Sequence, residues 1–206
     1  MILRGRMIMY KNWGMSAYYK KILKIFHIIF VASMFGGLVS ILNILIVKEN
    51  YHMMIENIFV VDLSILKIFT WGVNYAFFAL MLTSFIFGLF TEWGFVKHRW
   101  IIFKWIVVLI MFAVTWFGLG PAINGMTSIA DAGLNNSILS RDYINFQQKA
   151  IVFTIIEGVA IVLIVLISVL KPWGVRNIKR QVKQKTVVMI LLPIIVICIG
   201  FVAIKL

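Results

Sequence analysis

Cysteine and charged residues are scarce in this chain of 206 residues. It holds one cysteine, Cys198, and only 13% of its residues are charged. A lone cysteine cannot form an internal disulfide, and no Cys-x-x-Cys pair is present to bind a metal. So few charged residues cannot cover a soluble domain of this size with polar side chains. The composition therefore argues against a disulfide scaffold, a cysteine metal site and a soluble globular protein.

Catalytic signatures are also missing from the sequence. There is no hydrolase elbow, no Walker loop and no zincin motif, and serine and aspartate are sparse. Nucleophilic catalysis has no obvious set of residues, so whether the protein is an enzyme stays open. No soluble module combines basic and aromatic residues, which argues against nucleic acid as a partner.

Long apolar runs make up most of the chain. Hydrophobic residues make up 63% of the chain, and each run approaches or exceeds the roughly 20 residues that cross a bilayer as a helix. The runs are continuous rather than alternating, which favours helices over a barrel. We therefore predict an all-α integral membrane protein of one domain (1–206), a four-helix transmembrane bundle plus a fifth terminal transmembrane helix. The predicted spans are 25–47, 68–90, 100–119, 150–170 and 187–204.

The segments between the spans differ in length and charge. Residues 120–149 are predicted to form an outer loop, long enough for a small lid and too short for a domain. The net charge is +13, and fifteen of the twenty lysines and arginines fall on one side of the predicted topology. The positive-inside rule then puts the N-terminus inside, facing an anionic inner leaflet, and the C-terminus outside. Met1 and Met15 both stay open as the first residue.

Five ionisable side chains lie within or at the mouths of the spans, where each is costly and poses a functional question. They are His27, Lys67, His98, Lys104 and Glu157. His27 is the one histidine well inside a span. It is either a hydrogen-bonded residue near the headgroups or an axial haem ligand or proton carrier, because imidazole binds iron and titrates near neutral pH. His98 lies on the same side, in the turn before the third span.

Glu157 and Lys67 fall in the outer half of the membrane. Lys67 is placed to pair with Glu157 across the bundle, which would be a structural role. Alternatively, Glu157 carries protons or contacts a substrate, because a carboxylate in apolar surroundings takes up a proton more readily. The sequence leaves both readings open.

The stretch "YYKKILKIFHIIFVASMFGGLVSILNILIV" resembles the first span of a group of small bacterial membrane proteins. The group includes the four-helix protoporphyrinogen oxidase family and the copper-resistance D-like membrane domains. Its pattern is Leu-Lys-x-x-His-Ile-Ile-x-Val with a glycine ten residues after the histidine. The matching residues here are Leu23, Lys24, His27, Ile28, Ile29, Val31 and Gly37. The chain departs from the oxidase family at Asn43, where that family has arginine, and at Lys48, near the place of a second histidine.

The resemblance implies a redox protein of the bacterial cytoplasmic (inner) membrane that binds haem b or a porphyrin. His27 would be the metal ligand, with His98 nearby, and Lys104 would pair with a propionate. Two alternatives stay open: a small transporter or permease subunit that uses Lys67 and Glu157, and an accessory or immunity-type subunit without catalysis. A homo-oligomer and a different membrane partner are both compatible with the sequence.

Overall fold

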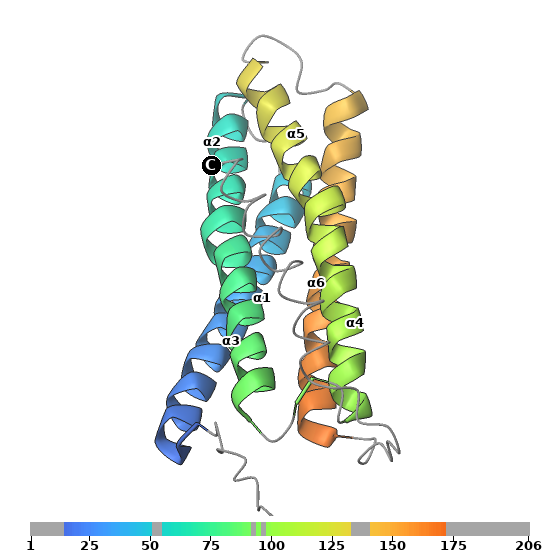
Figure 1. Cartoon of the computed structure of the whole chain (residues 1–206). Helices are drawn as coiled ribbons and strands as arrows, with labels where there is room; N and C mark the ends of the chain where they lie inside the picture. Colours follow the sequence, from blue (N-terminus) through green and yellow to red (C-terminus); the bar gives the residue numbers. More distant parts are fainter. Residues whose placement is uncertain (1–14, 51–54, 92–93, 96–97, 133–140, 172–206) are drawn as a thin grey trace, which may run out of the picture.

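The computed structural model describes residues 15–50, 55–91, 94–95, 98–132 and 141–171 (Figure 1). This part of the chain is almost entirely helical. Its segments are α1 (Ala17–Asn50), α2 (Ile55–Lys67), η1 (Ile68–Asn74), α3 (Tyr75–Phe90), α4 (Arg99–Val114), η2 (Thr115–Leu119), α5 (Gly120–Ala132) and α6 (Arg141–Leu170).

Four of the resulting rods are long and apolar enough to cross a membrane. They cover Ala17–Glu49, Asn57–Phe90, Arg99–Ala132 and Arg141–Leu170. The shortest has 30 residues, about 45 Å at 1.5 Å per residue, which exceeds the roughly 30 Å hydrocarbon core. The multi-pass helical prediction is confirmed for these four spans. The fifth predicted span, 187–204, lies outside the described residues.

The second rod begins earlier than the predicted span 68–90. α2 starts at Ile55 and passes into α3 without a break through η1, a π-helical segment. The predicted span begins only at residue 68, after Asp62 and Lys67. The structure buries Asp62 completely between helices, so its polarity is compensated inside the protein.

Most of the predicted outer loop 120–149 is helical in the structure, and residues 133–140 lie outside the described part of the chain. α5 continues the third rod as far as Ala132, and α6 begins at Arg141. The Gly-Pro signal at Pro121 does not end the helix, because η2 immediately before it is π-helical and the Gly120 N–H bonds to the Thr115 carbonyl. Such local π adjustments let transmembrane helices tolerate proline.

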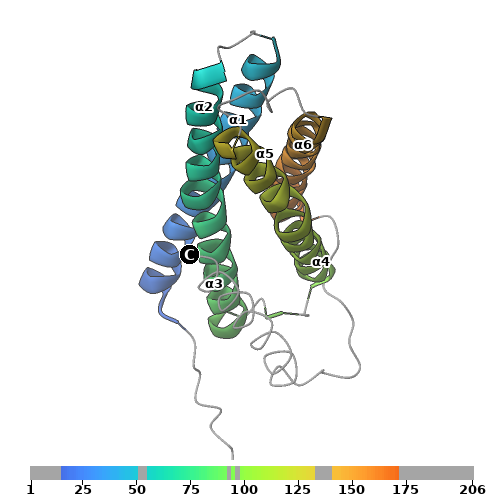
Figure 2. The same cartoon turned by 90° about the horizontal axis from the view of Figure 1, so that it is seen from above.

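The four rods form a bundle in which α1 packs against η1, α3 and α6, while α5 packs against α2 and α6 (Figures 1 and 2). α1 and η1 approach closely at two glycines, where a Cβ on Gly37 would lie 3.3 Å from the Gly72 carbonyl carbon. α3 and α4 diverge, and aromatic rings fill the space between them, such as Phe77 and Phe112 with centroids 6.3 Å apart. Large apolar side chains cover the outside of the bundle, as a lipid environment requires.

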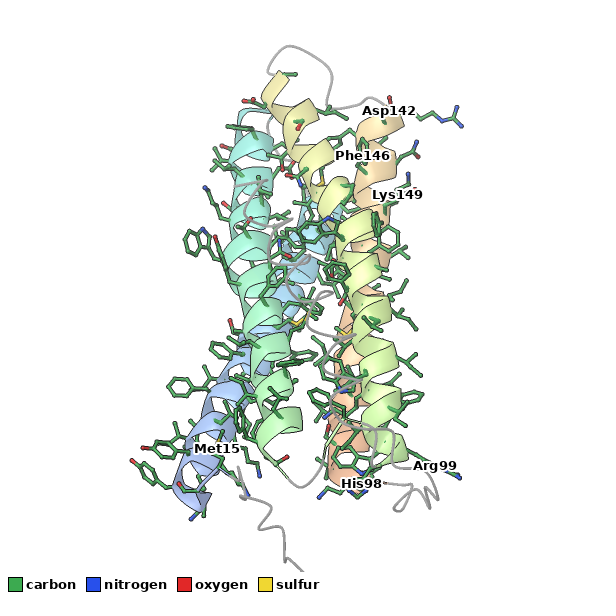
Figure 3. All side chains as sticks on the ribbon, in the orientation of Figure 1. Met15, His98, Arg99, Asp142, Phe146 and Lys149 are labelled. Atoms are coloured by element: carbon green, nitrogen blue, oxygen red, sulfur yellow. The ribbon has the colours of Figure 1, made fainter. Side chains whose placement is uncertain are left out.

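The two ends of the bundle differ in which segments they gather (Figure 3). Met15, His98 and Arg99 lie at one end, and Asp142 and Lys149 lie at the other. We call these the Met15 end and the Asp142 end. The first basic segment and the connection between the second and third rods therefore share an end, as the charge pattern predicts. Which end faces the cytoplasm stays a prediction.

Candidate functional site

Glu157 on α6 is fully buried within the bundle. Its Oε1 accepts a hydrogen bond of 2.7 Å from the Thr115 hydroxyl. Among the described residues, its Oε2 has no hydrogen-bond partner, and no salt bridge reaches the carboxylate. A buried carboxylate without a counter-charge is expensive unless a proton or a cation compensates it. The described protein groups alone therefore leave the site incomplete.

Thr115 places that carboxylate next to a cleft. It is the first residue of η2, and single-turn π segments in helices often lie at functional sites. Its side chain lines a cleft of about 400 Å³ between the second and third rods. Both π-helical segments contribute to the cleft, η1 through Phe69, Thr70 and Asn74 and η2 through Thr115 and Trp116. Thr115 thus borders the cleft and also bonds to the buried carboxylate.

A second polar group lies nearer the Asp142 end and joins four helices. Lys48 of α1 and Asp62 of α2 form a buried salt bridge with a separation of 2.5 Å. Tyr143 of α6 accepts a hydrogen bond from Lys48 at 2.9 Å and donates one to Asp62 Oδ2 at 2.7 Å. The Met126 sulfur of α5 lies 3.2 Å from the Lys48 Nζ. We call Lys48, Asp62, Met126 and Tyr143 the polar latch.

Every strong bonding group of the polar latch is occupied. The ammonium of Lys48 has three N–H donors, and they have three acceptors in Asp62, Tyr143 and Met126. Both Asp62 oxygens accept a bond, and the two charges cancel. A buried pair with this degree of saturation is stable as it stands and offers little to a ligand. The latch could not be recognised in the sequence, because Lys48 and Asp62 flank apolar runs and their positions are typical of residues at the membrane boundary.

His27 lies at the interface of α1 and α3. Its Nδ1 is 2.8 Å from the Thr83 Oγ1, and its ring packs edge-on against Phe87. The Thr83 hydroxyl donates its proton to the backbone carbonyl of Ala79 or Leu80. When the hydroxyl proton is used in this way, Thr83 accepts from the Nδ1–H of His27, and Nε2 is the basic nitrogen of that tautomer.

The other predicted site residues are spread over both ends of the bundle. Lys104 lies close enough to interact electrostatically with His27, and its Nζ lies 5.5 Å from the Trp100 ring centroid. His98 directly precedes α4, and its ring packs against Trp100. The predicted pair of Lys67 and Glu157 does not form. Lys67 is exposed, and the ion pair among the described residues joins Lys48 to Asp62 instead.

Metal ligands do not cluster in the described part of the chain. It contains no group of three or more histidine, cysteine, aspartate or glutamate side chains that could hold a metal ion. Comparison with protein-family models, with curated proteins and with solved structures gave no match. The resemblance to the protoporphyrinogen oxidase and copper-resistance D-like group therefore rests on the sequence alone, chiefly on the residues of the first span. Within the bundle, Glu157 and Thr115 are the arrangement most open to further chemistry.

Proposed function

We propose that the protein is a small membrane transport subunit that binds and releases a proton at Glu157. The observation that carries this proposal is a completely buried carboxylate whose Oε2 has no hydrogen-bond partner within the described part of the chain. Ionisable groups inside membrane proteins commonly belong to proton relays and substrate pathways. This proposal replaces Lys67 with Thr115 as the partner of Glu157.

Thr115 supplies the route by which a proton would reach the carboxylate. Its hydroxyl donates to Glu157 Oε1, and the residue is one of those that line the cleft. A hydroxyl has one donor and two acceptor positions, so it can accept a proton from the cleft side while it passes its own to Glu157. The opposite transfer returns the proton to the cleft. Neither step requires a separation of helices.

The experiment is infrared difference spectroscopy of the protein in lipid while the pH is changed. We expect a carbonyl band of a protonated carboxyl group that is absent in Glu157→Gln. Asp131→Asn is the matched control, because Asp131 is an exposed carboxylate on α5, and its loss should leave the band in place. A band that persists in a correctly folded Glu157→Gln protein would contradict the proposal.

Thr115→Val separates the relay from the carboxylate. Valine keeps the shape of threonine and lacks the hydroxyl, so Glu157 should still bind a proton but exchange it more slowly. The measurement is the rate at which the carboxyl band appears after a rapid pH jump. An unchanged rate would remove Thr115 from the route while leaving Glu157 as the proton-binding group.

A second candidate function, haem or porphyrin binding at His27, is favoured by one observation. The hydrogen bond to Thr83 is made by Nδ1, so Nε2 is the nitrogen that remains for a ligand, and metal-binding histidines commonly use one nitrogen as ligand while the other donates to a second group. Lys104 nearby fits a propionate. Haem would supply one-electron redox chemistry, while His27 and Lys104 would bind and orient it.

An absorption spectrum tests this second candidate. Wild-type protein, expressed with a haem supply and purified in mild detergent, should show a Soret band that shifts on reduction with dithionite. His27→Ala should lose the band, and Glu157→Gln should keep it. A colourless wild-type protein would contradict haem binding and leave the proton-binding proposal untouched.

A further inference from the structure

We infer that the cleft beside Thr115 binds a small organic cation, which exchanges with the proton on Glu157. This inference rests on the proposed function, because it names the class of solute that the same site would take. It comes from the shape of the cleft, its remaining hydrogen-bonding capacity, its aromatic walls and its charge.

The cleft has the size of a small-molecule site. Its volume is about 400 Å³, within the range of roughly 300–1,000 Å³ that is usual for ligand pockets. Ten of the described residues line it, among them three aromatic rings and four polar side chains. They come from α2, η1 and the start of α3 on the second rod and from η2 and α5 on the third.

The polar side chains of the cleft offer both acceptors and donors. Thr115 donates its only hydroxyl proton to Glu157, and Thr70 donates its own to the Leu66 carbonyl. The Asn124 amide donates one N–H to the Gly120 carbonyl, which leaves its oxygen and its second N–H. Asn74 adds an amide that can donate or accept. These groups can contact a polar ligand of either sign, so the charge and the aromatic walls of the cleft select a cation.

The charges around the cleft favour a cation over an anion. Among the described residues that line it there is no lysine, arginine or histidine. The carboxylate of Glu157 lies one hydroxyl group away, 2.7 Å from the Thr115 oxygen. In a medium of low dielectric constant, a negative charge so close attracts a cation strongly and opposes an anion.

Aromatic rings provide the remaining contacts. Phe69, Tyr75 and Trp116 line the cleft. Trp116 is held in place by stacking on Phe112 at 5.6 Å between centroids, and Tyr75 packs against Trp71 at 4.9 Å. The faces of tryptophan and tyrosine attract organic cations, and they do so most strongly where water is excluded.

Charge balance requires that one cation exchanges for one proton at Glu157. When the cation enters, the protonated carboxyl of Glu157 loses its proton to the cleft and becomes the counter-ion. When the cation leaves, a proton returns to the carboxylate. The net charge of the site is the same in both states, so neither state leaves an uncompensated charge in the membrane.

The test is calorimetric titration of the full chain in detergent with benzyltrimethylammonium as the probe. The neutral isostere 2,2-dimethylpropylbenzene and the anion benzoate serve as comparison ligands. We expect the cation alone to bind, and we expect proton release that scales with buffer ionisation enthalpy. Glu157→Gln should weaken binding at least about tenfold and abolish the proton release.

Trp116→Leu tests the aromatic wall independently of the carboxylate. It should weaken binding by roughly 3–30-fold, the range expected for one cation–π contact. Phe117→Leu is the matched control, because Phe117 is the next residue of η2, is exposed, and does not line the cleft. Equal effects of the two substitutions would overturn the assignment of the cleft.

The outcomes separate this inference from the proposed function. Equal binding of the cation and its neutral isostere, or no binding of either, would overturn the cation site. If the infrared band of Glu157 persists in that case, proton binding stands alone. Cation binding without proton release would overturn the exchange.

Discussion

The polar latch and the Glu157 site are both buried and ionisable, yet they differ in how their bonds are satisfied. In the latch, Lys48 and Asp62 neutralise each other, and Tyr143 completes their hydrogen bonds. Glu157 has one bond to Thr115 and a second oxygen without a partner among the described residues. Burial alone therefore does not mark a functional group. Saturation of its bonds separates a group that holds helices together from one that is ready to bind something.

The largest expected effect is the loss of one latch charge. Asp62→Leu should lower the free energy of unfolding by about 3–5 kcal/mol, because Lys48 is left buried and unpaired. The double variant Lys48→Met/Asp62→Leu should recover most of that loss. Unfolding in mixed micelles of mild detergent and dodecyl sulfate measures both. A single variant as stable as the wild type would show that the latch does not hold the helices.

Tyr143→Phe should have the next largest effect. It removes the donor to Asp62 and an acceptor of Lys48, and hydrogen bonds to charged groups contribute about 1.5–3 kcal/mol. The same unfolding assay applies, with Tyr18→Phe as control, since Tyr18 is exposed on α1. If both substitutions cost the same, the phenol of Tyr143 is not part of the latch.

Thr115→Val should cost about 1 kcal/mol of unfolding free energy, the usual net contribution of one hydrogen bond. Thr154→Val is matched to it, because Thr154 is also buried but donates to the Ala150 carbonyl of its own helix. That control should change stability by less than about 0.5 kcal/mol. If Thr154→Val lost more unfolding free energy than Thr115→Val, the hydrogen bond between Thr115 and Glu157 would not stabilise the fold.

Glu157→Gln should change stability least, by less than about 1 kcal/mol, and in the stabilising direction. Glutamine keeps the shape and the oxygen that accepts from Thr115, and it removes the need to compensate a buried charge. Thermal unfolding in detergent is sufficient to measure it. A loss as large as that of Asp62→Leu would mean that a positive group outside the described residues completes the site.

The sequence predicts much of the fold because apolar length alone identifies a spanning helix. It also identifies Glu157, since a single charge inside an apolar run is conspicuous. It misplaces the ends of the helices for a related reason. Lys48 and Asp62 lie in helices at the edges of apolar runs, and a pattern of hydropathy reads such polar residues as exposed. Only their mutual neutralisation, which is a tertiary contact, brings them inside.

Other parts of the site could not be predicted for different reasons. Thr115 is one of several threonines in the spans, and nothing local distinguishes the one that bonds to Glu157. Lys67 carries the right charge to pair with Glu157, but its position on α2 leaves it exposed. A single sequence records which residues are present on a rod, and the faces on which they lie depend on how the rods are rotated.

That rotation depends on the π-helical segments η1 and η2. On the second rod, the buried residues Phe69, Val73, Phe77, Met81 and Phe85 recur every four positions, whereas an α-helix completes a turn in 3.6 residues. One residue added to or removed from an α-helix turns everything beyond it by about 100°. A single deletion within η1 would therefore rotate α3 by about 100° relative to α2. The latch would keep its alignment, while the aromatic face of α3 would turn away from its neighbours.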